Sequence, residues 1–509
     1  MGLGVMESEK QGKSIDLRPI IYLYIYLPVL VFIIGWFKWY IGIPVSAAVL
    51  YALFYALYGS PDKKKRIDFE LNGINLFSSV LILEMLFIWC LYSGQGGYVE
   101  QAGDWNKHNS VLNLLTSNSW PVRGEFEGER GVLTYYVAGY IIPALSGKIA
   151  GGFLTAQKMT FVWTMIGLFL IIHLIADGLK VKNPWVRVAI VPLFICFSSF
   201  SCLLGGVYGY AVPGDVFNPT HFMSFSIPVQ FTSNIINLAW VYPQALSGWI
   251  TTLLLLRNMK KVENWGLILA PAILYSAFVF VSLLFTAFVL YTWTMADTWS
   301  KNGFKAGAQP MLKKLTDRRI ILAVVFLLPL ALYLSTSVFQ DKHGFSEMGF
   351  SFTDYQGNYK GLLIVNLMWG IWMLILLKKE KDNIVLYAAS IVFFVLSLVK
   401  FGTFNDICMR GSLVPMTLFA FLVIKNVVYS GKDKWYRWLL IACLLLTASG
   451  GMRELVDLYS VRGLNFENTE RGESSVEGFI NMMGDGWTNL YKYQYFYWGD
   501  GGLSDTLLK

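Results

Sequence analysis

The sequence predicts an all-α polytopic membrane protein with about 13 transmembrane helices and an external first loop that carries amphipathic and juxtamembrane helices. Of its 509 residues, 55% are hydrophobic and 15% are charged, whereas a soluble globular protein has about 25% charged residues. Apolar runs of roughly 17–25 residues recur along the chain, each long enough to cross about 30 Å of hydrocarbon. The first run begins near Pro19 and lacks a small-residue cleavage site, which is typical of a signal-anchor helix.

The net charge of +8 does not indicate nucleic-acid binding, because the basic residues are gathered in short loops between the apolar runs. Short basic loops mark the cytoplasmic side of a membrane protein. These loops are residues 63–66, 257–261, 313–319, 378–381 and 431–437. The five cysteines form no CxxC pair and four lie in apolar runs, which is typical of buried free thiols rather than of a disulfide or a metal site.

Placing every basic loop inside fixes an expected path of the chain. The expected spans lie near 20–36, 41–59, 73–92, 158–178, 186–205, 240–256, two halves of a hairpin within 264–296, 319–336, 361–378, 384–400, 412–429 and 437–450. The chain then divides into an N-terminal helical hairpin with its cytoplasmic loop (1–72), a transmembrane core (73–450) and an external C-terminal tail (451–509).

One apolar segment, residues 131–152, does not fit this path as a span. If it crossed the membrane, the basic loop at 179–183 would be outside, against the usual bias. We therefore expect a helix at or dipping into the outer interface, with its tyrosines in the headgroup layer. An ordinary span is the alternative.

Polar side chains gather on the predicted outer face. A carboxylate there can act as a general base toward an acceptor hydroxyl, and cations can stabilise a leaving phosphate. We assign catalysis to Asp104 and His108 and donor phosphate binding to Lys107, Lys148 and Arg410. Further contacts to substrate are expected from Asp406, Asn405, Gln244, His221 and Trp240.

Three stretches carry a resemblance to a known family. They are GDWNKHNSVLNLL with the following WPV, LTYYVAGYIIPALSGK, and NDICMRGSLVP, in this order and all on the predicted outer face. The chain resembles the GT-C superfamily of integral membrane glycosyltransferases, and more narrowly a group of bacterial multispanning proteins of this type. The resemblance covers most of residues 73–430.

The resemblance implies transfer of a sugar from a polyprenyl-phosphate-linked donor to an external acceptor, a cell-envelope glycan or glycolipid, at the outer face of the bacterial cytoplasmic membrane. One evident base and no nucleophile pair favour inversion at the anomeric carbon. Members of the superfamily often have two acidic residues close together in the first loop. Asp104 has no adjacent acidic partner, so we predict no metal ligands and leave a divalent cation open.

Each assignment has a structural alternative. Asp104 can simply cap the helix that follows it, Lys107 and His108 can be polar residues of its first turns, and Arg410 can form a salt bridge with Asp406. Glu84, in the middle of a span, is expected to face the bundle interior and to have a partner there.

Two other functions remain open at this stage. One is a polyprenyl-linked glycan polymerase or ligase, which would share donor and topology. The other is a transporter or flippase for lipid-linked sugars. Transporters usually have internal repeats and charges at the membrane midplane, whereas this sequence shows no clear repeat and its ionisable residues gather on one face.

Overall fold

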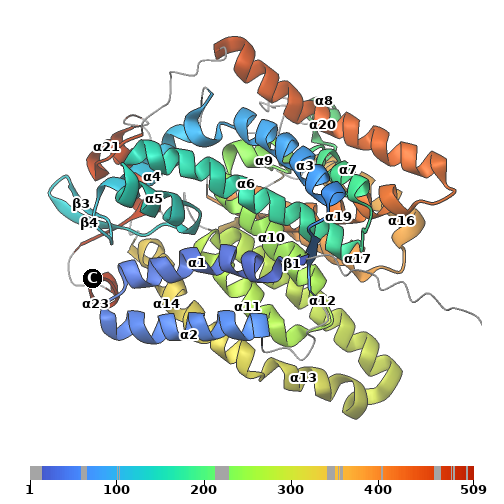
Figure 1. Cartoon of the computed structure of the whole chain (residues 1–509), viewed down its shortest axis with the longest axis horizontal. Helices are drawn as coiled ribbons and strands as arrows, with labels where there is room; N and C mark the ends of the chain where they lie inside the picture. Colours follow the sequence, from blue (N-terminus) through green and yellow to red (C-terminus); the bar gives the residue numbers. More distant parts are fainter. Residues whose placement is uncertain are drawn as a thin grey trace, which may run out of the picture.

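The computed structural model is a bundle of long helices with a small sheet at one end (Figure 1). The residues described are 14–58, 66–99, 101, 104–211, 229–340, 350–353, 355, 359–402, 405–462, 472–482, 484, 488–499 and 503–509. Eight of the segments described are long and apolar enough to cross a membrane. These segments are α1 (Arg18–Trp36), α2 (Trp39–Tyr58), α3 (Gly73–Tyr92), α6 (Phe153–Gly178), Ala277–Thr336, α16 (Tyr359–Glu380), Asp406–Tyr429 and Lys434–Val456.

Three of these segments need further definition. Ala277–Thr336 contains α12 (Ala277–Gly303), α13 (Gln309–Leu315) and most of α14 (Arg318–Gln340). Asp406–Tyr429 contains α18 (Asp406–Gly411) and α19 (Leu413–Tyr429), and Lys434–Val456 is most of α20 (Lys434–Arg462). Shorter apolar helices are α7 (Pro184–Ile195), α17 (Ile384–Leu398) and α11 (Trp265–Leu269) within Val262–Leu274. An all-α membrane protein is thus confirmed, whereas the expected number of 13 spans stays a prediction.

The centre of the bundle is formed by α10 (Tyr242–Arg257) and α19, which are buried on nearly all sides. A helix that is apolar all round is expected in such a central position. Gly248 allows the close approach of these two helices, since a Cβ atom there would lie 3.2 Å from the Cβ of Leu413. The outer helices expose apolar side chains instead; α2 is an example, with Trp39, Ile43 and Phe54 exposed.

The span expected at 186–205 is wrong as a single helix. Helix α7 ends at Ile195, and a new helix, α8 (Ser201–Ala211), begins after a break. Side chains from other elements satisfy the backbone of this break: Asn234 donates to the carbonyl of Phe194 at 2.8 Å, and Trp372 donates to that of Ser198 at 2.7 Å. Irregular backbone at membrane depth requires such partners, and they are too distant in sequence to be anticipated.

Residues 131–152 also differ from expectation. Residues 131–133 belong to strand β4 (Glu129–Leu133), and the helix α5 (Ala138–Ala150) has only 13 residues, too few to cross a bilayer. The tyrosines expected in the headgroup layer are buried inside the protein: Tyr135, Tyr136 and Tyr140 are 3%, 7% and 0% exposed.

The C-terminal tail begins later than expected and packs on the first loop. The expected boundary at 450 falls inside α20, which continues to Arg462. Strand β7 (Phe496–Trp498) pairs antiparallel with β4, which also pairs with β3 (Arg123–Phe126). The helices α4 (Trp105–Ser117), α21 (Val476–Asn481), α22 (Thr488–Tyr495) and α23 (Leu503–Leu507) lie at the same end. Two-stranded pairs join β1 (Ser14–Asp16) to β2 (Asp68–Glu70) and β5 (Phe350–Phe352) to β6 (Val399–Phe401).

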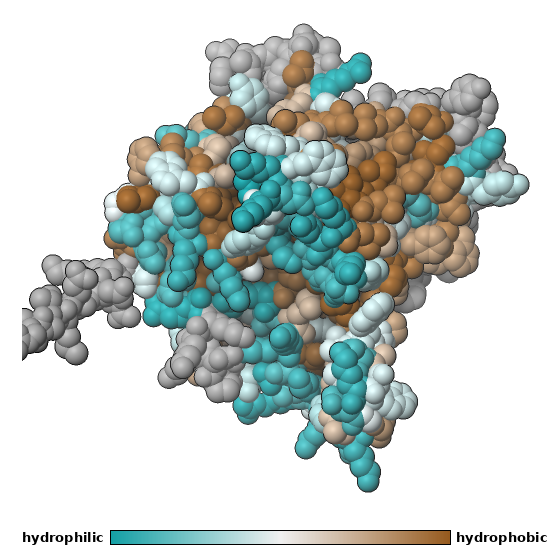
Figure 2. Space-filling view, turned by 90° about the vertical axis from the view of Figure 1, so that its right-hand side faces the viewer, coloured by the Kyte–Doolittle hydropathy of each residue, from teal (hydrophilic) through white to brown (hydrophobic). Residues whose placement is uncertain are grey.

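The opposite end of the bundle carries the basic loops at 257–261, 313–319, 378–381 and 431–437 (Figure 1). Arg257 is paired with Asp177 at 2.7 Å, Arg319 with Asp317 at 2.7 Å, and Lys378 with Asp433 at 3.0 Å. Figure 2 looks onto this end and shows hydrophilic residues across its middle with hydrophobic residues toward the upper right. The two ends therefore differ as the expected path of the chain requires; which end faces the cytoplasm stays a prediction.

Candidate active site

Asp104 is positioned by polar contacts that fasten the start of α4 to the end of α3. The indole of Trp105 donates to the carbonyl of Ser93 at 3.1 Å, and the amide of Gln101 donates to the carbonyl of Gly94 at 2.7 Å. Gly97 has a φ of +67°, and a Cβ atom there would lie 2.6 Å from the side chain of Gln157 on α6. Gly97 therefore packs tightly against α6, and the contacts of Gln101 and Trp105 hold the start of α4, and with it Asp104, beside the end of α3.

Asp104 does not act as a side-chain cap of α4. It occupies the N-cap position in helical conformation, and its carboxylate makes no cap hydrogen bond. Instead it forms an ion pair with Lys107 at 3.1 Å; the Lys107 side chain is 10% exposed and that of Asp104 is 38% exposed. Burial alone would raise the pKa of Asp104, but the charge of Lys107, with a contribution from Arg410, holds it below its ordinary value. The carboxylate is thus ionised and accessible.

His108 is enclosed and fully hydrogen-bonded. Its Nδ1 lies 2.6 Å from the hydroxyl of Tyr140, and its Nε2 lies 2.7 Å from the carbonyl oxygen of Trp240. Because a carbonyl only accepts, Nε2 carries the proton and Tyr140 donates to Nδ1. Burial, followed by the charge of Lys107, lowers the pKa of His108 to about 3. Since both nitrogens are occupied, these contacts favour a positioning role over the expected catalytic one.

We expect His108 to make stability depend on acid. Unfolded, it binds a proton below its ordinary pKa of 6.5, whereas the folded protein excludes this proton down to about pH 3. The stability it contributes is therefore present above pH 6.5 and is lost as pH falls through this window, by about 2 kcal/mol at pH 5. Thermal unfolding at pH 7 and pH 5 should show a smaller loss for His108→Gln than for the wild type. Equal losses in both proteins would contradict the assignment.

Arg410 is a buried cation near the end of α18, just before the start of α19. Its side chain is 6% exposed, and Nη1 lies 2.6 Å from the carboxylate of Asp406. The guanidinium carbon lies 6.0 Å from the ring centre of Tyr136 and 5.8 Å from that of Phe278, distances typical of cation–π contacts. Among the residues described, Nε has no hydrogen-bond partner. The guanidinium thus retains donor capacity that Asp406 does not use.

Asp104 and Arg410 lie near enough for their charges to interact. The charge of Arg410 acts on the Asp104 carboxyl, and both groups act on the hydroxyl of Tyr136. Burial first, and then the carboxylates of Asp104 and Asp406, raise the pKa of Tyr491 in the tail. The first loop, the segment after residue 405 and the tail therefore contribute to one charged cluster, which contains Asp104, Asp406 and Arg410.

A tyrosine cluster that the sequence does not predict lies beside these charged groups. The ring centre of Tyr135 lies 3.9 Å from that of Tyr136 and 4.5 Å from that of Tyr495. Tyr495 is stacked on Tyr491, with 5.4 Å between the ring centres. Tyr333 of α14 fixes the cluster by donating to the carbonyls of residues 133 and 135. The sequence predicts Tyr135 and Tyr136 for the headgroup layer, and nothing in the spacing of the LTYY stretch indicates that tyrosines of the tail contact it.

Several of the expected site residues lie elsewhere. Lys148 donates to the carbonyl of Asn118 and lies over Trp120; it is about 12 Å along α5 from Tyr140. Asn405 is 0% exposed, and its amide joins the backbones of Phe401 and Val399 at 3.1 and 3.2 Å. The geometry thus disfavours the phosphate role of Lys148 and the substrate role of Asn405.

The remaining three residues have different outcomes. Trp240 contributes its carbonyl to His108. Gln244 is 0% exposed, and neither side-chain polar atom has a hydrogen-bond partner among the described residues. It lies one turn before Gly248, on the α10 face that meets Leu413, so a substrate contact stays a prediction. His221 lies outside the described residues.

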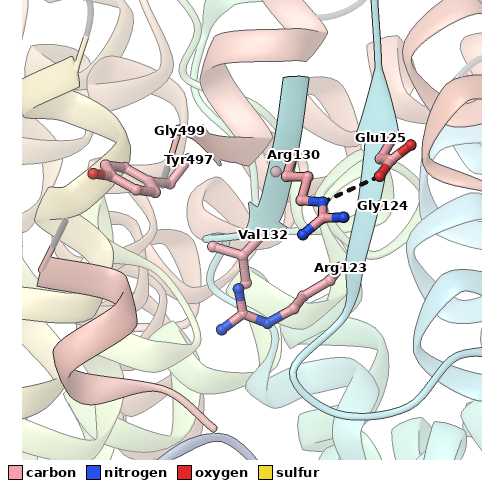
Figure 3. Close-up of a pocket in the computed structure, with 8 residues that line it drawn as sticks. Arg123, Gly124, Glu125, Arg130, Val132, Tyr497 and Gly499 are labelled. Carbon is pink, nitrogen blue, oxygen red and sulfur yellow. Dashed lines mark hydrogen bonds and ion pairs between the residues drawn. The ribbon is translucent and has the colours of Figure 1, made fainter. Parts of the chain in front are cut away.

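The surface of the described residues has two hollows that bear on the site. A polar one of about 380 Å³ lies on the β3–β4–β7 sheet (Figure 3), where Arg130 is paired with Glu125 at 3.2 Å. An apolar groove of about 630 Å³ lies between α3, α7, α9 (Asn234–Trp240) and α20. The residues lining the groove are Met85, Ile88, Trp89, Tyr92, Pro192, Ile195, Ile235, Met452, Leu455 and Val456.

Other features of the described residues bear on the sequence predictions. All five cysteines are free, as predicted. Within the described ranges no three His, Cys, Asp or Glu side chains gather in a way that could hold a metal ion. Compared with protein-family models, curated proteins and solved structures, the chain matches none. The fold and site thus define a helical membrane protein with a cluster of charged groups and tyrosines at one end.

Proposed function

We propose that the chain is an integral membrane glycosyltransferase of the GT-C type, which moves a sugar from a polyprenyl-phosphate-linked donor to a polar acceptor. The observation that supports this most is that the charge of Arg410 acts on the Asp104 carboxyl, although the two residues are far apart in the sequence. An ionised carboxylate beside a buried guanidinium with an unused donor suits a reaction in which a hydroxyl attacks and a phosphate leaves.

The roles follow from the chemistry of each group. The acceptor oxygen attacks the anomeric carbon and its proton passes to Asp104, while the bond from that carbon to the phosphate oxygen breaks. Arg410 stabilises the phosphate that leaves with the electron pair. Lys107 keeps Asp104 ionised, and His108 positions α4 against Tyr140 and Trp240. A single displacement of this kind inverts the anomeric configuration.

The apolar groove suits the lipid part of the donor. It is formed at the end of α3 from which the first loop starts, and it includes Ile235 of α9, the helix that ends at Trp240. A polyprenyl chain buried there would gain about 25 cal/mol for each Å² of apolar surface removed from water. Its phosphate would then lie toward the end of the bundle that carries Asp104 and Arg410.

Filling the groove is expected to weaken use of long-chain donors. Ile195→Trp should raise the KM for a polyprenyl-phosphate sugar about tenfold, because the added ring occupies space that the chain needs. A donor with a short lipid chain should be affected much less. Leu284→Trp, at an exposed position of α12 outside the groove, is the matched control. Equal KM values for both variants would place the lipid elsewhere.

The proposed function is tested with the purified protein in nanodiscs. A polyprenyl-phosphate-linked sugar and a glycan or glycolipid acceptor are supplied, and the release of polyprenyl phosphate and the anomeric configuration of the product are measured. We expect release to require acceptor and the product to be inverted. Movement of intact donor between leaflets without cleavage would instead favour a flippase, and repeated extension of one lipid-linked chain would favour a polymerase.

A further inference from the structure

Helix α3 presents a carboxylate to the surroundings of the bundle. Glu84 is exposed, contrary to the expectation that it faces the interior. It is the only charged residue of α3 and lies about 16 Å from Gly73 and about 12 Å from Tyr92 along the axis. Its depth therefore corresponds to the middle of the hydrocarbon layer, which is about 30 Å thick.

The face around Glu84 is otherwise apolar. The exposed side chains of α3 include Phe77 (55%), Val80 (50%), Phe87 (48%) and Ile88 (54%). The opposite side of the helix is buried, with Ile82 and Leu86 fully enclosed. We define the lipid-facing surface of α3 as Phe77, Val80, Glu84 and Phe87, which do not line the apolar groove. Lone ionisable side chains on such a surface are costly and generally mark a function.

The described part of the chain supplies no counter-ion for Glu84. Lys158, which is exposed, is on the adjoining helix α6. On the same helix, the ring of Phe161 packs against that of Phe87 of α3, with 5.2 Å between the ring centres. Because α3 and α6 run antiparallel, Lys158 lies one turn beyond this contact toward one end, and Glu84 one turn beyond it toward the other. The two charges are thus displaced by about 9 Å along the axis.

We propose that the lipid-facing surface of α3 binds a transmembrane helix of a partner protein that carries a basic side chain at the depth of Glu84. A second copy of this chain fits less well, since a twofold axis along the membrane normal would set Glu84 against Glu84 at equal depth. Lipid head groups carry their cations at the interface, not at the midplane. An apolar partner helix with one basic side chain can pack on the apolar face and pair its charge with Glu84.

The test uses model transmembrane peptides in nanodiscs that contain the full chain. Two polyleucine helices of about 20 residues differ only at the centre, where one has Lys and the other Leu, and binding is followed by energy transfer. The wild type should bind the Lys peptide about tenfold more tightly than the Leu peptide. Glu84→Gln should abolish this preference, and Glu84→Lys should transfer it to a peptide with a central Glu.

Two controls make the outcome decisive. Val80→Gln places a neutral polar group on the same surface and should leave the preference for the Lys peptide intact. Energy transfer between two labelled copies of the chain is measured in parallel. The proposal is overturned if the wild type does not distinguish the peptides, if Glu84→Gln retains the preference, or if Glu84 affects only the association of two copies. None of these readouts depends on glycosyl transfer.

Discussion

Replacing Asp104 by Asn is expected to lower the rate of sugar transfer by about 10²–10⁴-fold, the usual loss when a general base is removed. Asn has nearly the same size, but it cannot take a proton from the acceptor hydroxyl. The structure weakens the rival explanation that Asp104 is a helix cap, because its side chain makes no cap hydrogen bond. The measurement is single-turnover transfer of labelled sugar from the polyprenyl-phosphate donor.

The Asp104→Asn variant needs a control for stability, because it leaves the nearly buried Lys107 without its carboxylate. Asp104→Asn combined with Lys107→Gln removes both charges; it should melt closer to the wild type and still be inactive. Burial raises the pKa of Asp104 and Lys107 is the main group that lowers it, so Lys107→Gln alone should move the acidic limb of the pH–rate profile to higher pH. Near-full transfer by Asp104→Asn would remove Asp104 from the mechanism.

The sequence predicted helices well wherever an apolar run lies uninterrupted in the bundle. Helices α1, α3 and α16 begin and end within a few residues of their expected positions. Prediction failed where distant side chains replace helical hydrogen bonds, as at the break after Ile195, where Asn234 and Trp372 satisfy the free carbonyls. The composition around residue 195 does not indicate that these distant residues are its hydrogen-bond donors.

The site was predicted in part for a related reason. The expected path of the chain placed the loops of Asp104 and Arg410 on one face, and in the structure the charge of Arg410 acts on the Asp104 carboxyl. The sequence did not show that the polar side-chain atoms of Asn405 and His108 are already hydrogen-bonded to neighbouring residues. Nor did it reveal the tyrosines, since Tyr135 and Tyr495 meet only when β4 and β7 pair.

The position of Glu84 is a further point at which the sequence prediction was wrong. A charge in the middle of an apolar run predicts an interior position, because the sequence of one helix does not say which of its faces a neighbour covers. Helix α3 packs against α6 and α7 on one side and leaves the side of Glu84 open. The error therefore arises from tertiary packing, and its correction indicates a surface for a partner.

Replacing Arg410 by Lys is expected to lower kcat/KM for the lipid-linked donor by about 10–10²-fold, with the fold retained. The ammonium of Lys can still pair with Asp406, but it lacks the planar set of donors that binds a phosphate by two parallel hydrogen bonds. Binding of polyprenyl phosphate and of the uncharged polyprenol should be compared directly. The wild type should prefer the phosphate, and Arg410→Lys should lose most of this preference while still binding polyprenol.

Asp406→Asn separates phosphate binding from a purely structural ion pair. It removes the carboxylate that lies 2.6 Å from Arg410 and leaves the cation in place, so the preference for phosphate should persist or increase. If the pair were only structural, Asp406→Asn and Arg410→Ala would both destabilise the fold, since an unpaired buried charge typically costs about 3–5 kcal/mol, and Arg410→Lys would transfer sugar at the normal rate. A preference for phosphate that depends on Arg410 and not on Asp406 is the result that assigns Arg410 to the donor.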